Sequence, residues 1–178
     1  MNSITFLFLL VFSFFSSESV SDKISWSETN KLTWADFRGK HVVGADYVAS
    51  TSSGISFSYS FRTLNDSVDY KYSVESNFYP EESWYNPMYA SNYILKHEQA
   101  HFDISELHAR ILRKNISEAS FSLNIKNEIE IVYQNVEKQR REMQDRFDLE
   151  TDHSKNTKNE LTWEAFIAKQ LNVYERWK

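Results

Sequence analysis

The segment with the clearest chemical potential is His97-Glu98-Gln99-Ala100-His101, which has the spacing HExxH. Residues four apart in an α-helix share one face, one turn apart, so His97 and His101 can reach one ion. Two imidazoles at this spacing suit a tetrahedral Zn²⁺ at about 2.0–2.1 Å from each nitrogen. Glu98 lies about 100° round the helix, where it can act as general base toward a zinc-bound water. The motif predicts zinc-dependent hydrolysis.

A catalytic zinc site needs a third protein ligand and an open position. His108 returns to the metal face of the helix, but it lies about 10.5 Å along the axis from His101, which is too far. We favour His153, because a second helix packed antiparallel to the first would bring the segment that follows it back toward His97. The alternatives for the third ligand are Asp148, Glu150 and His41.

Two other acidic residues follow the motif on the same predicted helix. Glu106 lies about 180° round the helix from His97, so we expect a structural ion pair with Arg110 at i+4. Asp103 also points away from the metal face. We expect it to pack locally or to hold a ligand in place.

The elements that must position this motif follow from hydrophobic periodicity. Residues 54–61, GISFSYSF, alternate at period two, and residues 68–78 alternate again after the turn signal LNDS, which predicts a β-hairpin. Residues 79–92 contain both prolines and predict a loop. Ser91 or Asn92 can then cap a helix.

Helical periodicity occupies the C-terminal half of the chain. The predicted helices cover residues 93–114, 123–147 and 161–177, with a polar loop over residues 148–160. The sequence therefore predicts an α+β fold: a small antiparallel sheet in the N-terminal half, packed on a helical half that carries HExxH.

Composition excludes several classes of function. The chain has no cysteine, which excludes disulfides, thiolate zinc fingers, iron–sulfur clusters and a cysteine nucleophile. The formal net charge of -5 argues against a nucleic-acid partner. Three glycines leave little room for a phosphate-binding loop, and neither common phosphate-loop pattern occurs.

The N-terminus has the pattern of an export signal. The apolar run Ile4–Phe15 is too short to span a membrane but suits a signal-peptide core. Ser17 and Ser19 fit the small-x-small rule, so we predict cleavage after Ser19, with Ser21 as the alternative. Residues 1–19 are then a signal peptide and residues 20–178 one periplasmic or extracellular domain, with no membrane association after cleavage.

The motifs together resemble the DUF922 family of bacterial secreted proteins. The matching segments are LTWADFRG (32–39), Ala49 with TSSGI (51–55), Ser83-Trp84, LKHEQAHFDISELHAR (95–110), DLETDH (148–153) and Trp163. Phe147 and Glu160 stand where the family pattern has Tyr and Gln. The resemblance implies a zincin-like, Zn-dependent hydrolase.

These observations predict an exported zinc metallopeptidase that acts on a peptide or protein, with His97, His101 and His153 as ligands and Glu98 as base. An extended peptide could add to the edge of the sheet. Candidates for the donor that stabilises the oxyanion are Tyr85, Tyr89 and His108. Two alternatives stay open: a zinc hydrolase for cell-wall or other amides, and an exported binding module without catalysis.

Overall fold

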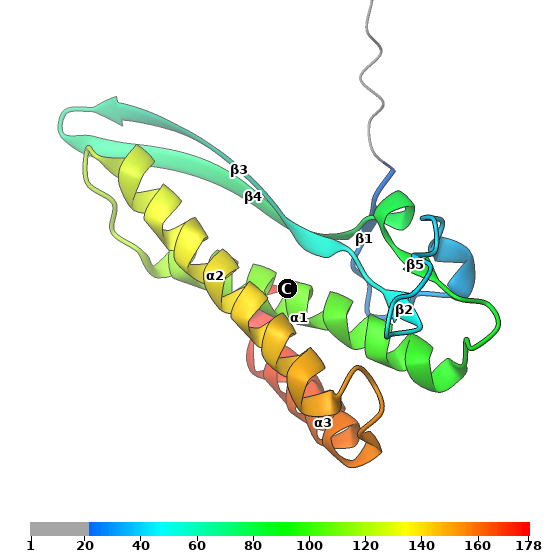
Figure 1. The fold of residues 1–178 in the computed structure, drawn as a ribbon. Helices are drawn as coiled ribbons and strands as arrows, with labels where there is room; N and C mark the ends of the chain where they lie inside the picture. Colours follow the sequence, from blue (N-terminus) through cyan, green and yellow to red (C-terminus); the bar gives the residue numbers. More distant parts are fainter. Residues whose placement is uncertain (1–21) are drawn as a thin grey trace, which may run out of the picture.

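The computed structural model describes residues 22–178, and the predicted signal peptide lies outside the described residues. A small antiparallel sheet in the N-terminal half covers a group of three helices in the C-terminal half, so the predicted α+β class is confirmed (Figure 1). The strands are β1 (Ile24–Ser25), β2 (Ala49–Ser50), β3 (Ser53–Leu64), β4 (Ser67–Phe78) and β5 (Trp84–Tyr85). The helices are α1 (Asn92–Glu118), α2 (Ile125–Thr151) and α3 (Thr157–Val173).

The predicted hairpin is confirmed as β3 and β4, which are longer than expected. Asn65 and Asp66 form a two-residue turn with φ of 48° and 61°, the left-handed conformation that tight hairpins need. The strand order β1-β4-β3 leaves one side of β3 as a sheet edge, while β2 pairs separately with β5. The apolar face of the hairpin packs on the helices through side chains that include Ile55, Phe57, Tyr72 and Val74.

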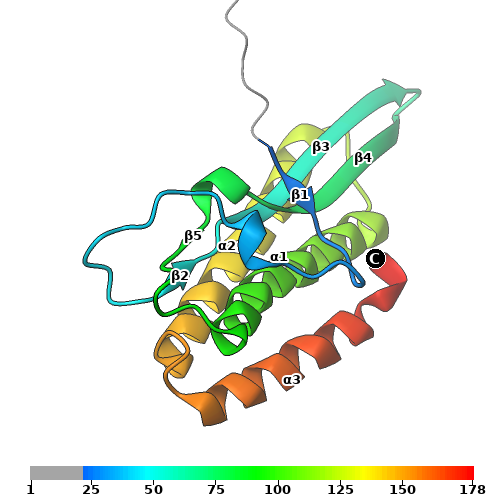
Figure 2. The ribbon, with the colours of Figure 1, turned by 90° about the vertical axis from the view of Figure 1, so that its right-hand side faces the viewer.

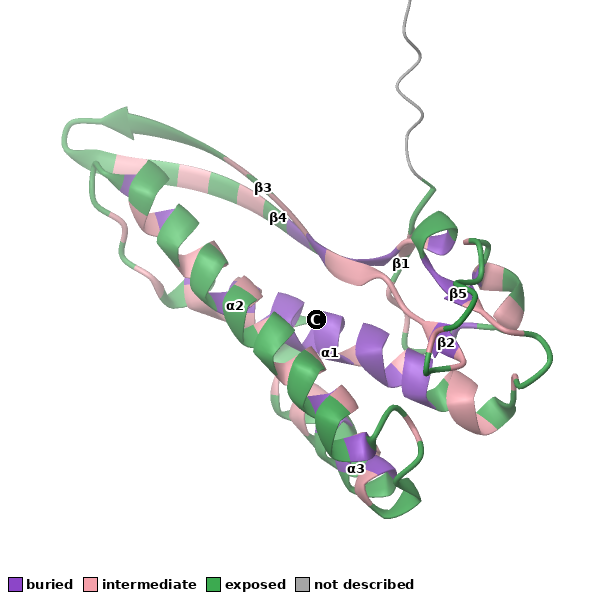
Figure 3. Ribbon diagram, viewed as in Figure 1, coloured by how far each residue is buried: buried purple, intermediate pink, exposed green. Residues whose placement is uncertain are grey.

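Helix α1 runs along the middle of the molecule, and α2 returns antiparallel beside it (Figures 1 and 2). Ser91 is the N-cap, since its Oγ accepts a hydrogen bond from the Ile94 N–H at 3.2 Å. Most of the second half of α1 is buried (Figure 3). The core at this end contains Leu112 and Ile116 of α1 against Ile125 and Ile129 of α2.

The prediction of a polar loop over residues 148–160 is wrong. Helix α2 continues to Thr151, and α3 begins at Thr157 behind the N-cap Asn156, whose Oδ1 accepts from the Asn159 N–H at 3.2 Å. The helix continues because Phe147 and Thr151 are fully buried and tie the last turn into the core. The polar residues between them lie on the other faces of α2, so Asp148 projects from a helix instead of a loop.

Helix α3 packs beside α1 and α2 through Trp163 and Ile167, which contact Phe147 and Ile104. The predicted ion pair is confirmed: Arg110 Nε lies 2.9 Å from Glu106 Oε1, with both side chains buried. Arg110 also donates to the Leu171 carbonyl at 2.7 Å, which fixes the end of α3 against α1. None of the helices within residues 22–178 is long and apolar enough to cross a membrane.

Candidate metal centre

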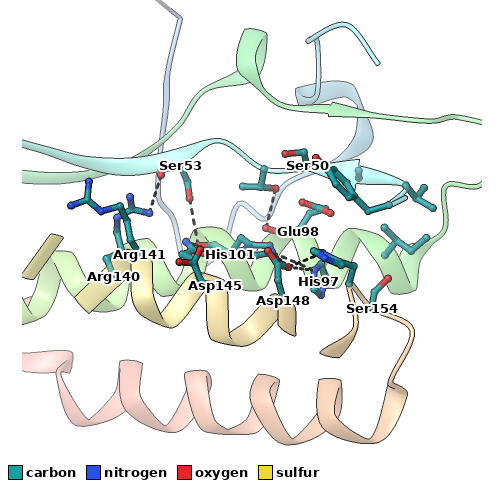
Figure 4. A pocket seen from close by; sticks show the side chains of 17 residues that line it. Ser50, Ser53, His97, Glu98, His101, Arg140, Arg141, Asp145, Asp148 and Ser154 are labelled. Carbon is teal, nitrogen blue, oxygen red and sulfur yellow. Dashed lines mark hydrogen bonds and ion pairs between the residues drawn. The ribbon is translucent and has the colours of Figure 1, made fainter. Parts of the chain in front are cut away.

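His97 and His101 lie on one face of α1, one turn apart, as the spacing predicts. Their Nε2 atoms are 3.2 Å apart, and both residues are buried (Figure 4). Phe147 of α2 packs against both rings, at centroid distances of 4.5 Å and 5.0 Å. The two nitrogens therefore face the same small space between α1 and α2.

Asp148 of α2 completes a group of three donors. Its Oδ1 lies 3.2 Å from His97 Nε2 and 3.0 Å from His101 Nε2. Two atoms about 2.0–2.1 Å from one tetrahedral ion are about 3.3 Å apart, so the observed separations match the donor set of a zinc site. In residues 22–178 these are the three side chains whose ligand atoms all lie within 4.8 Å of each other.

His153 lies next to this group but outside it. Its Nδ1 is 3.5 Å from Asp148 Oδ1, its side chain is 43% exposed, and its ring stacks on Tyr47 at 5.4 Å. Asp152, His153 and Ser154 all have positive φ, so the backbone turns away from α2 immediately before the histidine. Zinc ligation by His153 stays a prediction, whereas Asp148, one of the alternatives, occupies the position between the two nitrogens.

The other two alternatives have different partners. Glu150 accepts a hydrogen bond from Trp163 Nε1 at 2.8 Å. His41 packs edge-on against Trp84 at 5.3 Å. Neither belongs to the three-residue group.

Each histidine is oriented by a partner on a different helix. Glu160 of α3, which is fully buried, accepts from His97 Nδ1 at 3.0 Å. Gln144 of α2 accepts from His101 Nδ1 through Oε1 and donates from Nε2 to the His101 carbonyl at 2.8 Å. When the rings are neutral with the hydrogen on Nδ1, each Nε2 lone pair is available to an ion at the centre, as metal-binding histidines require.

The charges of the group are strongly coupled. Burial alone would lower the pKa of His97, but hydrogen bonds to Asp148 and Glu160 outweigh it and raise that pKa to about 9. Burial opposes ionisation of Asp148, yet hydrogen bonds from His101 and His97 hold its pKa well below the ordinary value. Burial raises the pKa of Glu98, and the neighbouring histidine charges only partly oppose this.

A cavity of about 370 Å³ opens over the three donors (Figure 4). Its walls come from the β2–β3 segment, α1, α2 and the α2–α3 turn, and Glu98 lies in the lining. Thr51 Oγ1 donates to the Glu98 carbonyl at 3.3 Å, and Ser53 Oγ to the His101 carbonyl at 3.4 Å. These bonds hold the strand segment directly over the HExxH turn.

The family model described as "Bacterial protein of unknown function (DUF922)" matches residues 35–154, more than half of the chain. The chain belongs to the DUF922 family. The matched region includes HExxH, Asp148 and His153 and ends before Glu160. No curated protein and no solved structure matches the chain.

The three residues suggested as donors to the oxyanion in this DUF922 site do not line the cavity. Tyr85 stacks on Trp34 at 4.6 Å, and Tyr89 is 62% exposed on a loop. His108 is buried, with Nδ1 2.9 Å from the Ile104 carbonyl, and burial lowers its pKa. The polar residues that do line the cavity beyond the donor group include Tyr47, Arg140, Arg141, Gln144 and Asp145.

Sequence reasoning missed Gln144 and the role of Glu160. Gln144 lies four residues before Asp148, so a longer α2 would have placed the two on one face. In the sequence, Glu160 stands out only as a departure from an expected glutamine, and nothing there links it to His97. Asp103, expected to pack locally or to hold a ligand, accepts from Trp26 Nε1 at 2.6 Å and from Gln99 Nε2 at 2.8 Å.

Proposed function

We propose that this DUF922 protein is an exported zinc-dependent hydrolase, and in particular a metallopeptidase. The observation that carries the proposal is the convergence of His97, His101 and Asp148 within 4.8 Å, beside the buried Glu98 and open to a cavity. Two imidazoles and one carboxylate form the donor set of a catalytic zinc site with one open position. A structural site would more commonly have four ligands and cysteines.

Asp148 is the third ligand in this proposal. Its carboxylate lies 3.0–3.2 Å from both imidazole nitrogens, and its low pKa keeps it ionised and able to bind a cation. Glu160 and Gln144 hold the two rings in the ligating orientation. A bound Zn²⁺ would supply Lewis acidity, polarising a carbonyl oxygen and lowering the pKa of water.

Glu98 is the general base in this proposal. The residue next to His97 on α1 points into the same cavity as the donors, within the wall that a substrate would face (Figure 4). Its raised pKa brings the carboxylate closer to working pH, where it can take a proton from water and then deliver it to a leaving amine. The chain therefore provides both the acid–base group and a metal-binding group.

The edge of the β2–β3 segment suits a peptide substrate. Asn86 N–H donates to the Val48 carbonyl at 2.8 Å, and Ser52 N–H to Ser83 Oγ at 2.9 Å, so these residues face β5. Because alternate residues of a strand direct their backbone groups to opposite edges, Ala49 and Thr51 direct theirs toward the cavity. An extended peptide can pair there, directly above the HExxH turn.

The test uses purified full-length protein with added Zn²⁺ and two substrate panels, one of peptides and one of peptidoglycan fragments. We expect peptide cleavage that a chelator stops and Zn²⁺ restores. Glu98→Gln should lower kcat by about 10²–10⁴-fold while zinc binding is retained, because only the acid–base group is lost. Activity confined to peptidoglycan would support an amide hydrolase instead. Zinc binding without hydrolysis of either panel would overturn the enzyme proposal.

A further inference from the structure

Two arginines lie at the end of the cavity opposite His153, and their surroundings differ. Arg140 is engaged: it contacts Glu137 at 2.6 Å and 2.9 Å and donates to the Ser53 carbonyl at 3.2 Å. Arg141 also lines the cavity, but it is exposed, and no carboxylate within residues 22–178 lies within 4.0 Å of its guanidinium (Figure 4). A cation with no ion-pair contact within 4.0 Å in the described residues therefore faces a substrate cavity in a chain of net charge -5.

The position of Arg141 along α2 relative to the metal group is fixed by helix geometry. Arg141, Gln144 and Asp148 share the cavity-facing side of the helix, and seven residues correspond to about 10.5 Å along the axis. An extended peptide rises about 3.3 Å per residue, so this distance covers about three residues. The backbone of Arg141 is therefore placed for its side chain to contact a substrate side chain a few residues from the scissile bond.

The open edge of the β2–β3 segment determines in which direction a bound peptide runs through the cavity. Ser53 lies at the Arg140 end of the cavity, bonded to His101 and Arg140, while Ala49 lies at the other end of the same segment. An antiparallel pairing is the more stable arrangement for an added strand. It places the N-terminal part of a peptide beside Ser53 and hence toward Arg141.

Asp145 lies on α2 between Arg141 and the metal-binding group. It lines the cavity one turn of α2 after Arg141 and three residues before Asp148. A negative side chain next to the scissile bond would lie nearer to Asp145 than to Arg141 and be repelled. The same side chain two or three residues further toward the substrate N-terminus would lie beside Arg141 and be attracted.

We propose that Arg141 is a specificity-determining residue that selects peptides with an acidic side chain two or three residues N-terminal to the cleaved bond. The inference rests on the proposed peptidase function and adds its substrate class. A carboxylate and a guanidinium form charge-assisted hydrogen bonds, which are stronger than neutral ones. The acidic residue increases substrate binding without taking part in the chemistry.

The experiment compares two sets of peptides, which differ only in the position of one Glu or of one Lys, from four residues before to three residues after a neutral cleavage site. Two readouts are used: kcat/KM of the zinc-loaded protein, and binding of the same peptides to the Glu98→Gln variant by fluorescence anisotropy. We expect Glu at the second or third position before the bond to improve both by about tenfold. Arg141→Glu should reverse this preference toward Lys, and zinc content should not change.

Arg146→Glu is the matched control. Arg146 is an exposed arginine of α2 outside the cavity lining, with Glu150 at 3.7 Å, so reversal of its charge should leave the preference unchanged. Equal cleavage of all peptides, a preference for Glu after the bond, or an unchanged preference in Arg141→Glu would each overturn the proposal. Cleavage of none of them by the wild type would instead count against the peptidase function itself.

Discussion

The interface between α1 and α2 is polar at one end, where two buried histidines border a cavity, and apolar and fully buried at the other. At one end His97 and His101 meet Gln144 and Asp148; at the other, residues such as Ile116 and Ile125 meet with no exposed surface. Buried polar groups are tolerable only when each finds a partner. The polar end therefore depends on a complete set of hydrogen bonds, and the apolar end supplies the stability that holds this set in place.

The largest expected effect is on zinc affinity at the polar end, where Asp148 and His153 are compared as ligands. Asp148→Ala should weaken zinc binding by more than about 100-fold, because it removes a ligand and not an outer contact. His153→Ala should change zinc affinity by less than about tenfold, since its nitrogen contacts only Asp148. Competition with a zinc chelator of known affinity measures both, and the reverse order of effects would reinstate His153 as the ligand.

The next effect belongs to the apolar end. Ile116→Ala should lower the free energy of unfolding by about 2–5 kcal/mol, because the side chain is fully buried and leaves a cavity. Zinc affinity of the folded variant should be unchanged. Urea unfolding, together with zinc titration well below the midpoint, measures the two quantities separately. A parallel loss of zinc affinity would contradict the division of roles along the interface.

A smaller effect concerns the orienting carboxylate on α3. Glu160→Gln should lower zinc affinity by about 10–100-fold, because a neutral amide supports the His97 imidazole less strongly than a carboxylate. The comparison with Gln144 makes this informative, since His101 already has an amide partner. Gln144→Glu is the reciprocal variant and should raise zinc affinity, at the cost of the hydrogen bond that Gln144 Nε2 donates to the His101 carbonyl. Calorimetric titration of both variants tests the pair, and equal affinities would show that the charge of these partners does not matter.

The smallest effect is the pH dependence of stability in the metal-free protein. The folded-state pKa of His97 is raised to about 9, above its usual 6.5, so its protonation stabilises the folded state. That contribution is fully present below pH 6.5 and is lost as pH rises through about 9. We expect Tm to fall by a few degrees between pH 6.5 and 9 in wild type and in Ile116→Ala alike. A Tm independent of pH in this window would contradict the coupling of His97 to its carboxylate partners.

Much of this architecture follows from sequence, and the exceptions have physical causes. Period-two alternation located β3 and β4, and the HExxH spacing placed His97 and His101 together. The third ligand was harder to predict. A helix is recognised in a sequence by its apolar face, and the polar residues around Asp148 therefore resemble a loop. A helix that faces a metal group has polar residues on that face, so composition alone ended α2 too early. Glu160 depends on how α3 packs on α1, which local periodicity does not determine.

The stacked rings at the cavity have a consequence for motion. His153 stacks on Tyr47, and Tyr47 stacks in turn on Trp84 of β5 at 5.5 Å, which joins the α2–α3 turn to the small β2–β5 sheet. The turn carries three successive left-handed residues, a backbone conformation that surrounding contacts must maintain. Widening the entrance therefore requires the rings to separate. The stacked rings therefore link the two walls of the cavity, and Tyr47 is the contact on which this link depends.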